Sequence, residues 1–268
     1  MKKVEITPRA RAAFQRRVWE FYGKHRRDFP WRFEKSAYAV FVSEVMLQQT
    51  QTARVLPKYE MFLREFPDFE SLAKANPKRV LRAWSGLGYN RRALMLHGAA
   101  KIVARRYRGV LPADREALEE LPGIGKGTSG ALMAFIFNTP EPFIETNIRR
   151  VFLHHFFSSS RKKIKDDEIA RLVSDTFDRR NPREWCYALM DYGSWLGLNK
   201  KTNPNRKSAG YKKQKAFRGS DREIRGFILA KFLAGEPIFP KGVAAKFNAE
   251  IIRVKSIVEK MKREKLIR

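Results

Sequence analysis

The feature that most constrains the fold of this 268-residue chain is a helical spacing of apolar residues along almost all of its length. Apolar side chains recur three and four positions apart in residues 14–22, 80–84 and 169–177, so each stretch places them on one face of a helix. Alternation of the kind that a strand requires is hard to find. Short breaks that contain Pro or Gly separate the stretches. The sequence therefore predicts an all-α fold of about eight to twelve short helices.

The charge of the chain indicates what it binds. The sequence holds 56 Lys and Arg against 28 Asp and Glu, a formal net charge of +28. With 43% apolar residues the chain is too hydrophobic for a disordered basic tail, so these charges must cover a folded body. Such a surface attracts polyanions and releases their counterions on binding. We expect a nucleic-acid partner; a basic surface that only maintains solubility is the alternative, and an anionic membrane is a weaker one.

Several further features set the expected compartment and cofactor content. No apolar run approaches the roughly 18 residues of a membrane-spanning helix, and the first residues lack the apolar core of a secretion signal. We expect a cytoplasmic monomer, nucleoid-associated in a bacterium or archaeon. A single cysteine, Cys186, excludes an internal disulfide, and it lies in an apolar stretch. The adjacent His154 and His155 would point about 100° apart on a helix, so they predict no metal site.

The composition changes after about residue 198. Residues 199–219 are rich in Lys, Arg, Gly, Pro and Asn and contain few apolar anchors, which is typical of a loop or linker that lies against DNA. Helical periodicity returns in residues 220–268 and is interrupted once by GEPIFPKG. We expect a small, basic, helical or winged-helix appendage there.

The most specific local motif is LPGIGKGT at residues 121–128, which precedes the helix-like SGALMAFIF. Alternate glycines behind a proline favour a tight turn between two helices. They also let backbone N–H groups at the start of the second helix approach a phosphate oxygen. A Gly-rich turn that only joins two helices is the alternative. The candidates for contact with a nucleic-acid backbone are Gly123, Gly125, Lys126, Gly127 and Thr128.

A second motif, YAVFVSEVMLQQT, covers residues 38–50. If it is helical, Glu44 has apolar residues one turn before it and Leu47 and Gln48 one turn after it. Desolvation would then raise the pKa of its carboxyl and make it a proton donor near neutral pH. Gln48 and Gln49 could read base edges or fill a gap in a duplex. The alternative is an ordinary glutamate and a polar helix face.

Taken in order, several sequence blocks resemble the helix-hairpin-helix DNA glycosylases, and most closely the MutY adenine glycosylases. These blocks are FPW with YAVFVSEVMLQQTQTARV, then WSGLGYNRRALMLH, LPGIGKGTSGAL, FIETNIRRV and ALMDYGSWLG. They extend over roughly residues 26–198. The resemblance implies an all-α, two-lobed fold with DNA in its cleft and one nucleotide turned out of the duplex.

The resemblance also implies a division of the chain and roles for its residues. Residues 30–140 would form a six-helix lobe with the hairpin, and residues 1–29 and 141–198 a second helical lobe; the linker at 199–219 and the appendage at 220–268 lie outside the resemblance. Glu44 matches the glutamate that protonates the adenine and assists the attacking water. The expected contacts with substrate come from further residues: Trp31 and Leu47 in the base pocket, Gln49 and Tyr89 as wedges in the base stack, Gln48 beside them, and Asp191 against the flipped adenine.

The chain departs from the family at its second carboxylate. The family carries an aspartate that stabilises the sugar cation and positions water, whereas this chain has Glu145. Glutamate keeps the charge and reaches one methylene further, so we expect it to function. A non-catalytic DNA-binding protein that has lost its chemistry at this position is the alternative.

Two further departures concern a lysine and a cluster. Lyase relatives carry a lysine where this chain has Gly127, with Lys126 one position early, so we expect hydrolysis without a Schiff base. Many relatives hold an iron–sulfur cluster with four cysteines, and this chain has Gly197 near the first of those positions. We therefore expect no cluster and no other cofactor. Instead, the basic loop would contact phosphates through Lys200, Lys201, Arg206 and Lys207; a solvated linker is the alternative.

The sequence constrains the identity of the excised base less than it constrains the type of reaction. Residues 216–268 do not resemble the β-rich domain that helps MutY proteins recognise 8-oxoguanine. The expected substrate is adenine opposite guanine or 8-oxoguanine. The alternatives are thymine or uracil opposite guanine, and hypoxanthine. An RNA-binding protein is also compatible with the charge.

Overall fold

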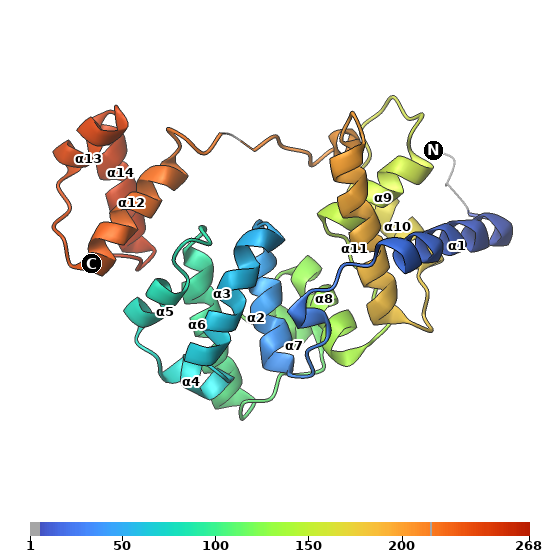
Figure 1. Ribbon diagram of the computed structural model, residues 1–268, viewed down its shortest axis with the longest axis horizontal. Coiled ribbons are helices and arrows are strands. Elements are labelled where there is room, and N and C mark those ends of the chain that lie inside the picture. The colour runs from blue at the N-terminus through green and yellow to red at the C-terminus, as the bar shows by residue number, and fades with distance from the viewer. Residues whose placement is uncertain (1–5, 215) are drawn as a thin grey trace. The chain divides into compact units, whose positions relative to one another are not determined.

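The computed structural model describes residues 6–214 and 216–268 of the chain (Figure 1). Residues 1–5, which belong to the predicted second lobe, and Lys215, in the predicted basic linker, lie outside the described residues. In the described part there is no strand, and the isolated parallel bridge between Ile164 and Ser208 is the one β-type contact. The prediction of an all-α chain is confirmed.

The described residues form fourteen α-helices and two 3-10 helices, more α-helices than the sequence predicts. The excess comes from short elements such as α4 (Phe69–Lys74), α5 (Pro77–Ala83) and α7 (Arg115–Glu119), which have 6, 7 and 5 residues. A helix of one or two turns is too short for apolar periodicity to separate it from the helix that follows.

The chain divides into two compact units, and each is built from several segments. The first unit comprises Met1–Lys35, Ala113–Glu119 and Ile124–Lys212. Its helices are α1 (Pro8–His25), η1 (Pro30–Arg32), α7, α8 (Lys126–Phe137), α9 (Thr146–Phe156), α10 (Asp166–Thr176), α11 (Pro182–Asn199) and η2 (Pro204–Lys207). Its core is aromatic: Phe14 of α1 contacts both Phe152 of α9 and Trp185 of α11.

The second unit comprises Ser36–Pro112, Glu120–Gly123 and Lys213–Arg268. Its helices are α2 (Ala37–Leu47), α3 (Thr52–Glu65), α4, α5, α6 (Arg91–Arg106), α12 (Asp221–Ala234), α13 (Pro240–Phe247) and α14 (Ile251–Arg263). Helix α12 packs on α5. The C-terminal helices therefore share a unit with residues 36–112, and the hairpin segment at 121–128 passes from this unit into the first.

Local sequence signals explain where these helices begin. Thr7 and Ser36 accept hydrogen bonds from the third backbone N–H that follows each of them, and both precede a helix. Asp68 and Ser71 form a reciprocal capping box at the start of α4. Asn76 caps α5, which begins with a proline. The punctuation by Pro and polar residues therefore marks real helix starts.

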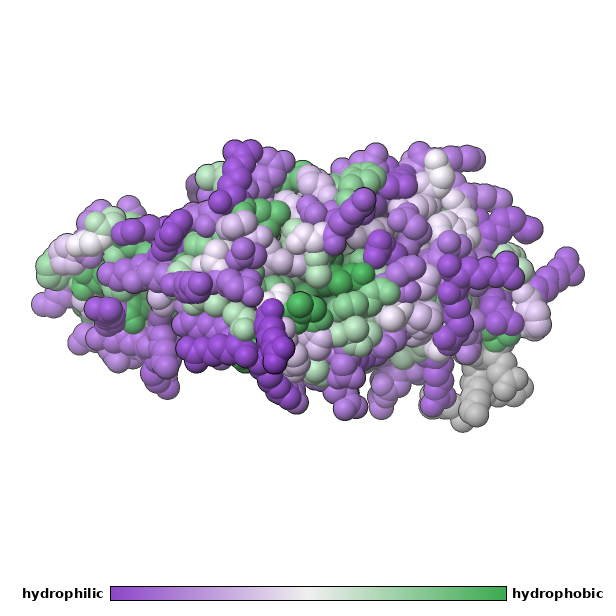
Figure 2. All heavy atoms as spheres, turned by 90° about the horizontal axis from the view of Figure 1, so that it is seen from below, coloured by the Kyte–Doolittle hydropathy of each residue, from purple (hydrophilic) through white to green (hydrophobic). Residues whose placement is uncertain are grey.

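Polar side chains cover most of the face that Figure 2 shows, as the charge of the chain requires. None of the described helices combines the length and the apolar character that crossing a bilayer requires.

Helices α9 and α11 approach each other closely because α11 has a glycine at the contact. A Cβ atom added to Gly193 would lie 2.2 Å from the backbone oxygen of Asn147, far inside van der Waals contact. A Cβ atom on Gly197, one turn later, would lie 2.6 Å from Nη1 of Arg150. These two glycines therefore form a groove on α11 that accepts the start of α9.

We expect Gly193→Ala to lower the free energy of unfolding by about 3 kcal/mol, because the clash is with backbone and cannot be relieved by a rotamer change. Gly23→Ala is the control, since nothing lies within 4 Å of the Cβ position in that helix. The control should raise the free energy of unfolding by about 0.5–1 kcal/mol. Urea denaturation followed by circular dichroism measures both free energies of unfolding. Equal values for the two variants would contradict the conclusion that the close contact between α9 and α11 requires Gly193.

Candidate functional site

Glu44 is the only charged side chain on α2, a helix whose other residues are mostly apolar. Phe41 one turn earlier and Val45 beside it are buried, whereas Glu44 keeps partial exposure. The other residues of α2 are buried on nearly every side of the helix. The structure thus places this carboxyl where the sequence predicts it, on an apolar helix and within reach of solvent.

A buried arginine that the sequence analysis missed holds the end of α2. Nη1 of Arg92 donates to the backbone oxygens of Val45 and Met46, at 2.8 and 3.0 Å. Nη2 donates to Oγ1 of Thr50 and to the backbone oxygen of Gly88. Burial lowers the pKa of Arg92 to about 10, so the group stays charged at neutral pH. Arg92 therefore fixes the turn after Glu44 against the loop before α6.

The two predicted wedge residues share an unusual backbone conformation. Gln49 and Tyr89 have φ angles of 55° and 46°, a left-handed region that costs energy for residues other than glycine. Strain of this kind concentrates at functional sites. Gln49 is exposed, and Tyr89 is 36% exposed. The turn that carries Gln49 and the loop that carries Tyr89 are both bonded to Arg92.

The hydroxyl of Tyr89 also meets the beginning of the C-terminal helices. It accepts hydrogen bonds from Nε2 of Gln214 and, at 3.3 Å, from Nη1 of Arg222. The Arg222 guanidinium lies 6.0 Å from the centre of the Tyr89 ring. The segment that leads into α12 is thus anchored at a predicted substrate-binding residue.

The hairpin glycines Gly123 and Gly127 lie in different structural environments. Gly123 has a φ of 84°, and a Cβ atom there would lie 3.0 Å from Cβ of Met95. Its backbone oxygen accepts a hydrogen bond from Nε2 of Gln48 at 3.1 Å, which ties the hairpin to the end of α2. A Cβ atom on Gly127 would lie 3.4 Å from the backbone oxygen of Ile144.

The start of α8 has the properties of an anion-binding helix end. Gly125 is its N-cap residue and supplies no side chain to cap it. Gly125 and Lys126 are exposed, while Gly127 and Thr128 are partly exposed. Backbone N–H groups at such an end, beside a lysine, favour a phosphate. The predicted backbone contact remains a prediction that this geometry supports.

Glu145 is the N-cap residue of α9. Its Oε1 accepts hydrogen bonds from the backbone nitrogens of Asn147 and Ile148, both at 2.7 Å, and its Oε2 accepts from Nδ2 of Asn147 at 3.3 Å. Burial raises the pKa of this carboxyl, although the two backbone N–H groups and Arg150 act in the opposite direction. The carboxylate is therefore fixed in orientation, with Oε1 fully used and Oε2 only weakly bound.

Arg150 and Asn147, both missed by the sequence analysis, support this cap. Nη1 of Arg150 donates to Oδ1 of Asn147 at 2.8 Å and to the backbone oxygen of Gly193 at 2.6 Å. Nε donates to Oδ1 of Asn203 at 3.2 Å. Spacing alone gives no signal for this network, because its members come from α9, α11 and a distant loop.

The segment at 203–209 packs against α9 and the loop that follows it. The amide of Asn205, which is 5% exposed, donates to the backbone oxygen of Thr146 at 3.0 Å. Nζ of Lys207 donates to the backbone oxygens of Ser158 and Ser160, both at 2.7 Å. Two of its three donors are thus used inside the protein, so Lys207 is a poorer candidate for phosphate contact than the exposed Lys200, Lys201 and Arg206.

The chain does not fit the iron–sulfur cluster that the resemblance associates with this region. A four-thiolate cluster needs four cysteines, and the sequence has only Cys186, which is buried in α11. Gly197, near the first of the cysteine positions, instead leaves room for Arg150.

The histidine pair of α9 is also part of the packing. His155 lies in the aromatic core with Nε2 2.9 Å from the Tyr192 hydroxyl, and burial lowers its pKa to about 4.

Asp191 is occupied by two arginines of its own unit. Its carboxylate accepts hydrogen bonds from Nε of Arg27 at 2.7 Å and from both terminal nitrogens of Arg32, at 2.8 and 2.7 Å. The side chains of Asp191 and Arg32 are 1% and 3% exposed. This geometry is that of a buried ion pair, and the predicted contact with a flipped adenine stays a prediction.

The other predicted pocket residues differ in exposure. Trp31 lies in η1, is only 4% exposed, and stacks on Phe29 with ring centres 5.0 Å apart. Leu47, the last residue of α2, keeps partial exposure. Leu47 is therefore accessible to a ligand in this structure, and Trp31 is largely covered.

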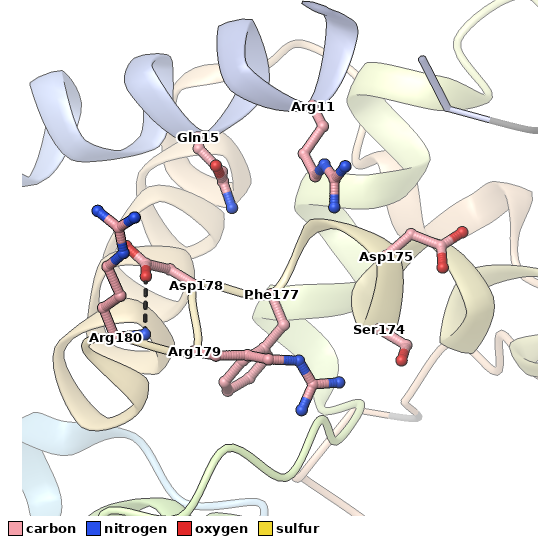
Figure 3. Close-up of a pocket in the computed structure, with 8 residues that line it drawn as sticks. All are labelled: Arg11, Gln15, Ser174, Asp175, Phe177, Asp178, Arg179 and Arg180. Atoms are coloured by element: carbon pink, nitrogen blue, oxygen red, sulfur yellow. Dashed lines mark hydrogen bonds between the residues drawn. The ribbon is translucent and has the colours of Figure 1, made fainter. Parts of the chain in front are cut away.

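A pocket of about 580 Å³ lies in the first unit at α1 and the end of α10 (Figure 3). Charged groups of both signs line it, and several bond to the protein itself. Asp178 accepts from the indole of Trp19 and from the backbone nitrogen of Arg180, and Gln15 donates to the backbone oxygen of Thr176. None of the predicted site residues lines this pocket.

Comparisons with known proteins place these features in context. Residues 42–176 match the family described as "HhH-GPD superfamily base excision DNA repair protein". The chain is 35% identical over 227 residues to an adenine DNA glycosylase of Mycolicibacterium smegmatis, covering 78% of this chain and 76% of that protein. It is 33% identical over 179 residues to the adenine DNA glycosylase of Buchnera aphidicola subsp. Baizongia pistaciae, and this match covers 67% of this chain. The chain spans only about half, 50%, of that Buchnera protein.

Solved structures give the same fold. A thermostable thymine-DNA glycosylase superimposes with a TM-score of 0.66 at 26% identity, covering 72% of this chain and 90% of that one. A trapped endonuclease III–DNA covalent intermediate superimposes with a TM-score of 0.60 at 14% identity, covering 74% of this chain and 91% of that one. The prediction of a helix-hairpin-helix glycosylase fold is confirmed.

We expect Asp191→Asn to lower the free energy of unfolding by about 3 kcal/mol, because it leaves the buried Arg32 charge without its partner. Asp28→Asn is the control: that aspartate pairs with Arg26 on the surface, with its side chain 68% exposed. It should change the free energy of unfolding by about 0.5 kcal/mol or less. Thermal unfolding compares the two. An Asp191→Asn protein as stable as the wild type would contradict a structural role.

Proposed function

The chain belongs to the HhH-GPD superfamily of base excision DNA repair proteins, and on this premise we propose that it is a monofunctional DNA N-glycosylase. It flips a mispaired base out of duplex DNA and removes it by hydrolysis, most favourably adenine opposite guanine or 8-oxoguanine. The observation that carries this proposal is a pair of carboxylates in contrasting environments. One lies on an apolar helix, and the other is fixed by backbone N–H groups at a helix start.

Glu44 acts as the acid. Breaking the bond between the sugar C1′ and the base nitrogen leaves the bonding electrons on the base, which must gain a proton to become a good leaving group. A carboxyl in apolar surroundings that retains access to solvent can hold that proton and deliver it. Water then attacks C1′, and a carboxylate takes up the proton that this water releases.

Glu145 stabilises the positive charge that develops on the sugar. The hydrogen bonds to its Oε1 hold the carboxylate rigid before the reaction, so little reorganisation is needed as charge appears. The network of Asn147 and Arg150 keeps the cap in place. A fixed cap also accommodates the extra methylene of glutamate, because the head group is positioned by the helix start.

Hydrolysis without a Schiff base follows from the hairpin. Position 127 is a glycine whose Cβ site faces the backbone oxygen of Ile144, so the chain has no amine there. Lys126 is exposed and precedes it, where its charge suits a phosphate. We further propose that the protein acts as a cytoplasmic monomer on double-stranded DNA and needs no cofactor.

Thymine or uracil opposite guanine is the second candidate substrate class. The superposition on a thymine-DNA glycosylase at 26% identity favours it. Hypoxanthine would suit the same purine pocket as adenine. A non-catalytic protein that recognises mismatches is the remaining alternative, and it predicts binding without release of a base.

A panel of duplexes tests the activity and the substrate together. We expect the wild-type protein to release adenine opposite guanine or 8-oxoguanine, detected as strand breaks after alkali, and to release less thymine, uracil or hypoxanthine. Glu44→Gln should abolish release but bind the mispair almost as tightly, since the shape is kept and the proton donor is lost. Glu60→Gln on the exposed face of α3 is the control. Release by Glu44→Gln at the wild-type rate would refute the acid assignment.

Glu145→Gln should lower the single-turnover rate by a factor on the order of 10² or more, because the charge is lost. Glu145→Asp, which keeps the charge and is a good N-cap residue, should retain measurable activity. Since burial raises the pKa of Glu145, the wild-type rate should fall on acidification at a pH above the usual range of a glutamate. A rate profile from pH 5 to 8 checks this, and a Glu145→Gln protein with the wild-type rate would show a purely structural cap.

A further inference from the structure

The three C-terminal helices of the second unit, α12, α13 and α14, pack against one another. We propose that α13 and α14 are a helix-turn-helix, and that α14 binds the major groove of the duplex beside the damaged base. This second DNA-binding site goes beyond the proposed glycosylase activity. It rests only on the protein acting on duplex DNA.

The helices share one small core. Its apolar residues are buried and come from all three helices and the C-terminal residues: Ile224, Ile228 and Leu229 of α12, Val243 and Ala244 of α13, Val254, Ile257 and Met261 of α14, and Leu266 and Ile267. Arg253 of α14 pairs with Asp221 of α12 at 2.6 Å, and Arg225 of α12 pairs with Glu264. The position of α14 on α12 is thus fixed by packing and by charge.

A sharp turn joins α13 to α14. Only residues 248–250 separate the two helices. Asn248 adopts the left-handed conformation, with φ at 45°, and the backbone nitrogen of Ala249 donates to the backbone oxygen of Ala244. A short helix, a three-residue turn with a left-handed residue and a longer helix are the elements of a DNA-binding helix-turn-helix.

The outward face of α14 is exposed, basic and partly apolar. Val254, Ile257 and Met261 face the core, so the opposite side of the helix carries Ile252, Ser256, Glu259 and Arg263, with Lys255 and Lys260 at its edges. Glu259 pairs with Lys262 at 3.7 Å, so the face remains basic overall. Ile252 is 80% exposed, which is unusual for an isoleucine. From residue 251 to the end there are seven Lys or Arg and two Glu.

This combination fits DNA better than it fits a protein partner. Lysine and arginine along a helix neutralise phosphates, and an apolar side chain near the start of a recognition helix can contact the methyl group of thymine. Protein interfaces are depleted of lysine at their centre. The chemistry of the face therefore selects a duplex as its occupant.

Contacts within the second unit place this element near the proposed site. Arg82 of α5 donates to the backbone oxygen of Leu233, and Nζ of Lys78 lies 4.7 Å from the ring centre of Phe232, so α12 is docked on α5. At the other end Arg222 contacts Tyr89, the predicted wedge. Because Asp221, next to Arg222, pairs with Arg253 of α14, α12 links α14 to Tyr89, and we take the duplex that flanks a base at Tyr89 as its ligand.

The test measures binding to undamaged duplex DNA, so it does not depend on base release. The full chain is compared with a variant carrying Lys255→Gln, Lys260→Gln and Arg263→Gln. The control carries Arg9→Gln, Arg171→Gln and Arg179→Gln, three exposed positions in the first unit with the same loss of charge. Dissociation constants are measured at several salt concentrations.

We expect the α14 variant to reduce the slope of log affinity against log salt by about 0.9 for each phosphate that it no longer neutralises, and the control to leave the slope nearly unchanged. The difference should disappear on duplexes shortened by about one helical turn, ~10 bp, on the side that α14 occupies. Equal slopes for the two variants would overturn the proposal. Normal base release in the duplex panel would then show that the glycosylase proposal stands without it.

A second measurement locates the helix. An iron–EDTA reagent is attached to Ser256→Cys, and the native Cys186 is 1% exposed and should not react. We expect the bound protein to cleave the backbone within a few base pairs on one side of an abasic-site analogue. Cleavage no stronger than that by free reagent, with the protein bound, would overturn the placement of α14 in the groove. Ile252→Glu should weaken binding severalfold, and unchanged binding would count against contact through this face.

Discussion

One guanidinium, that of Arg150, ties the helix start that the candidate catalytic carboxylate caps to the rest of its unit. The group joins Asn147 at the start of α9, the backbone of α11 at Gly193 and the loop at Asn203. Without Gly193 the helices could not approach closely enough, and without the approach the backbone oxygen would be out of reach. The start of α9, which Glu145 caps through local hydrogen bonds, is therefore also held in place by tight packing against α11.

Arg92 provides the corresponding support in the second unit. It bonds backbone oxygens at the end of α2 and in the loop of Tyr89, so the turns that carry two strained residues, Gln49 and Tyr89, are joined by a single buried charge. A charge in the interior is costly unless its donors are satisfied. Here hydrogen bonds from the two terminal nitrogens to carbonyl groups at the helix end offset part of that cost, while the buried Nε has no partner among the described residues.

Sequence patterns predicted the features that depend on local chemistry. The helical content follows from spacing and residue type and is confirmed. The positive φ of Gly123 and the position of Glu44 on a mostly buried helix also fit those patterns. Asp191 shows the limit: the family resemblance implied a contact with the flipped base, and only the fold reveals that Arg27 and Arg32 bind its carboxylate. Arg150 and Asn205 could not be predicted either, since they have partners that lie 43 to 59 residues away along the chain.

The loop at 203–209 supports α9 with amide and ammonium hydrogen bonds at a place where the resemblance leads one to expect metal–thiolate bonds. Hydrogen bonds of this kind form as the chain folds and are insensitive to oxidation state, whereas a cluster must be assembled and can be oxidised. The support can also be altered one residue at a time, because each bond contributes only about 1 kcal/mol. In this protein the shape around the candidate catalytic helix is therefore set by the chain's own side chains, and it should tolerate gradual change over evolution.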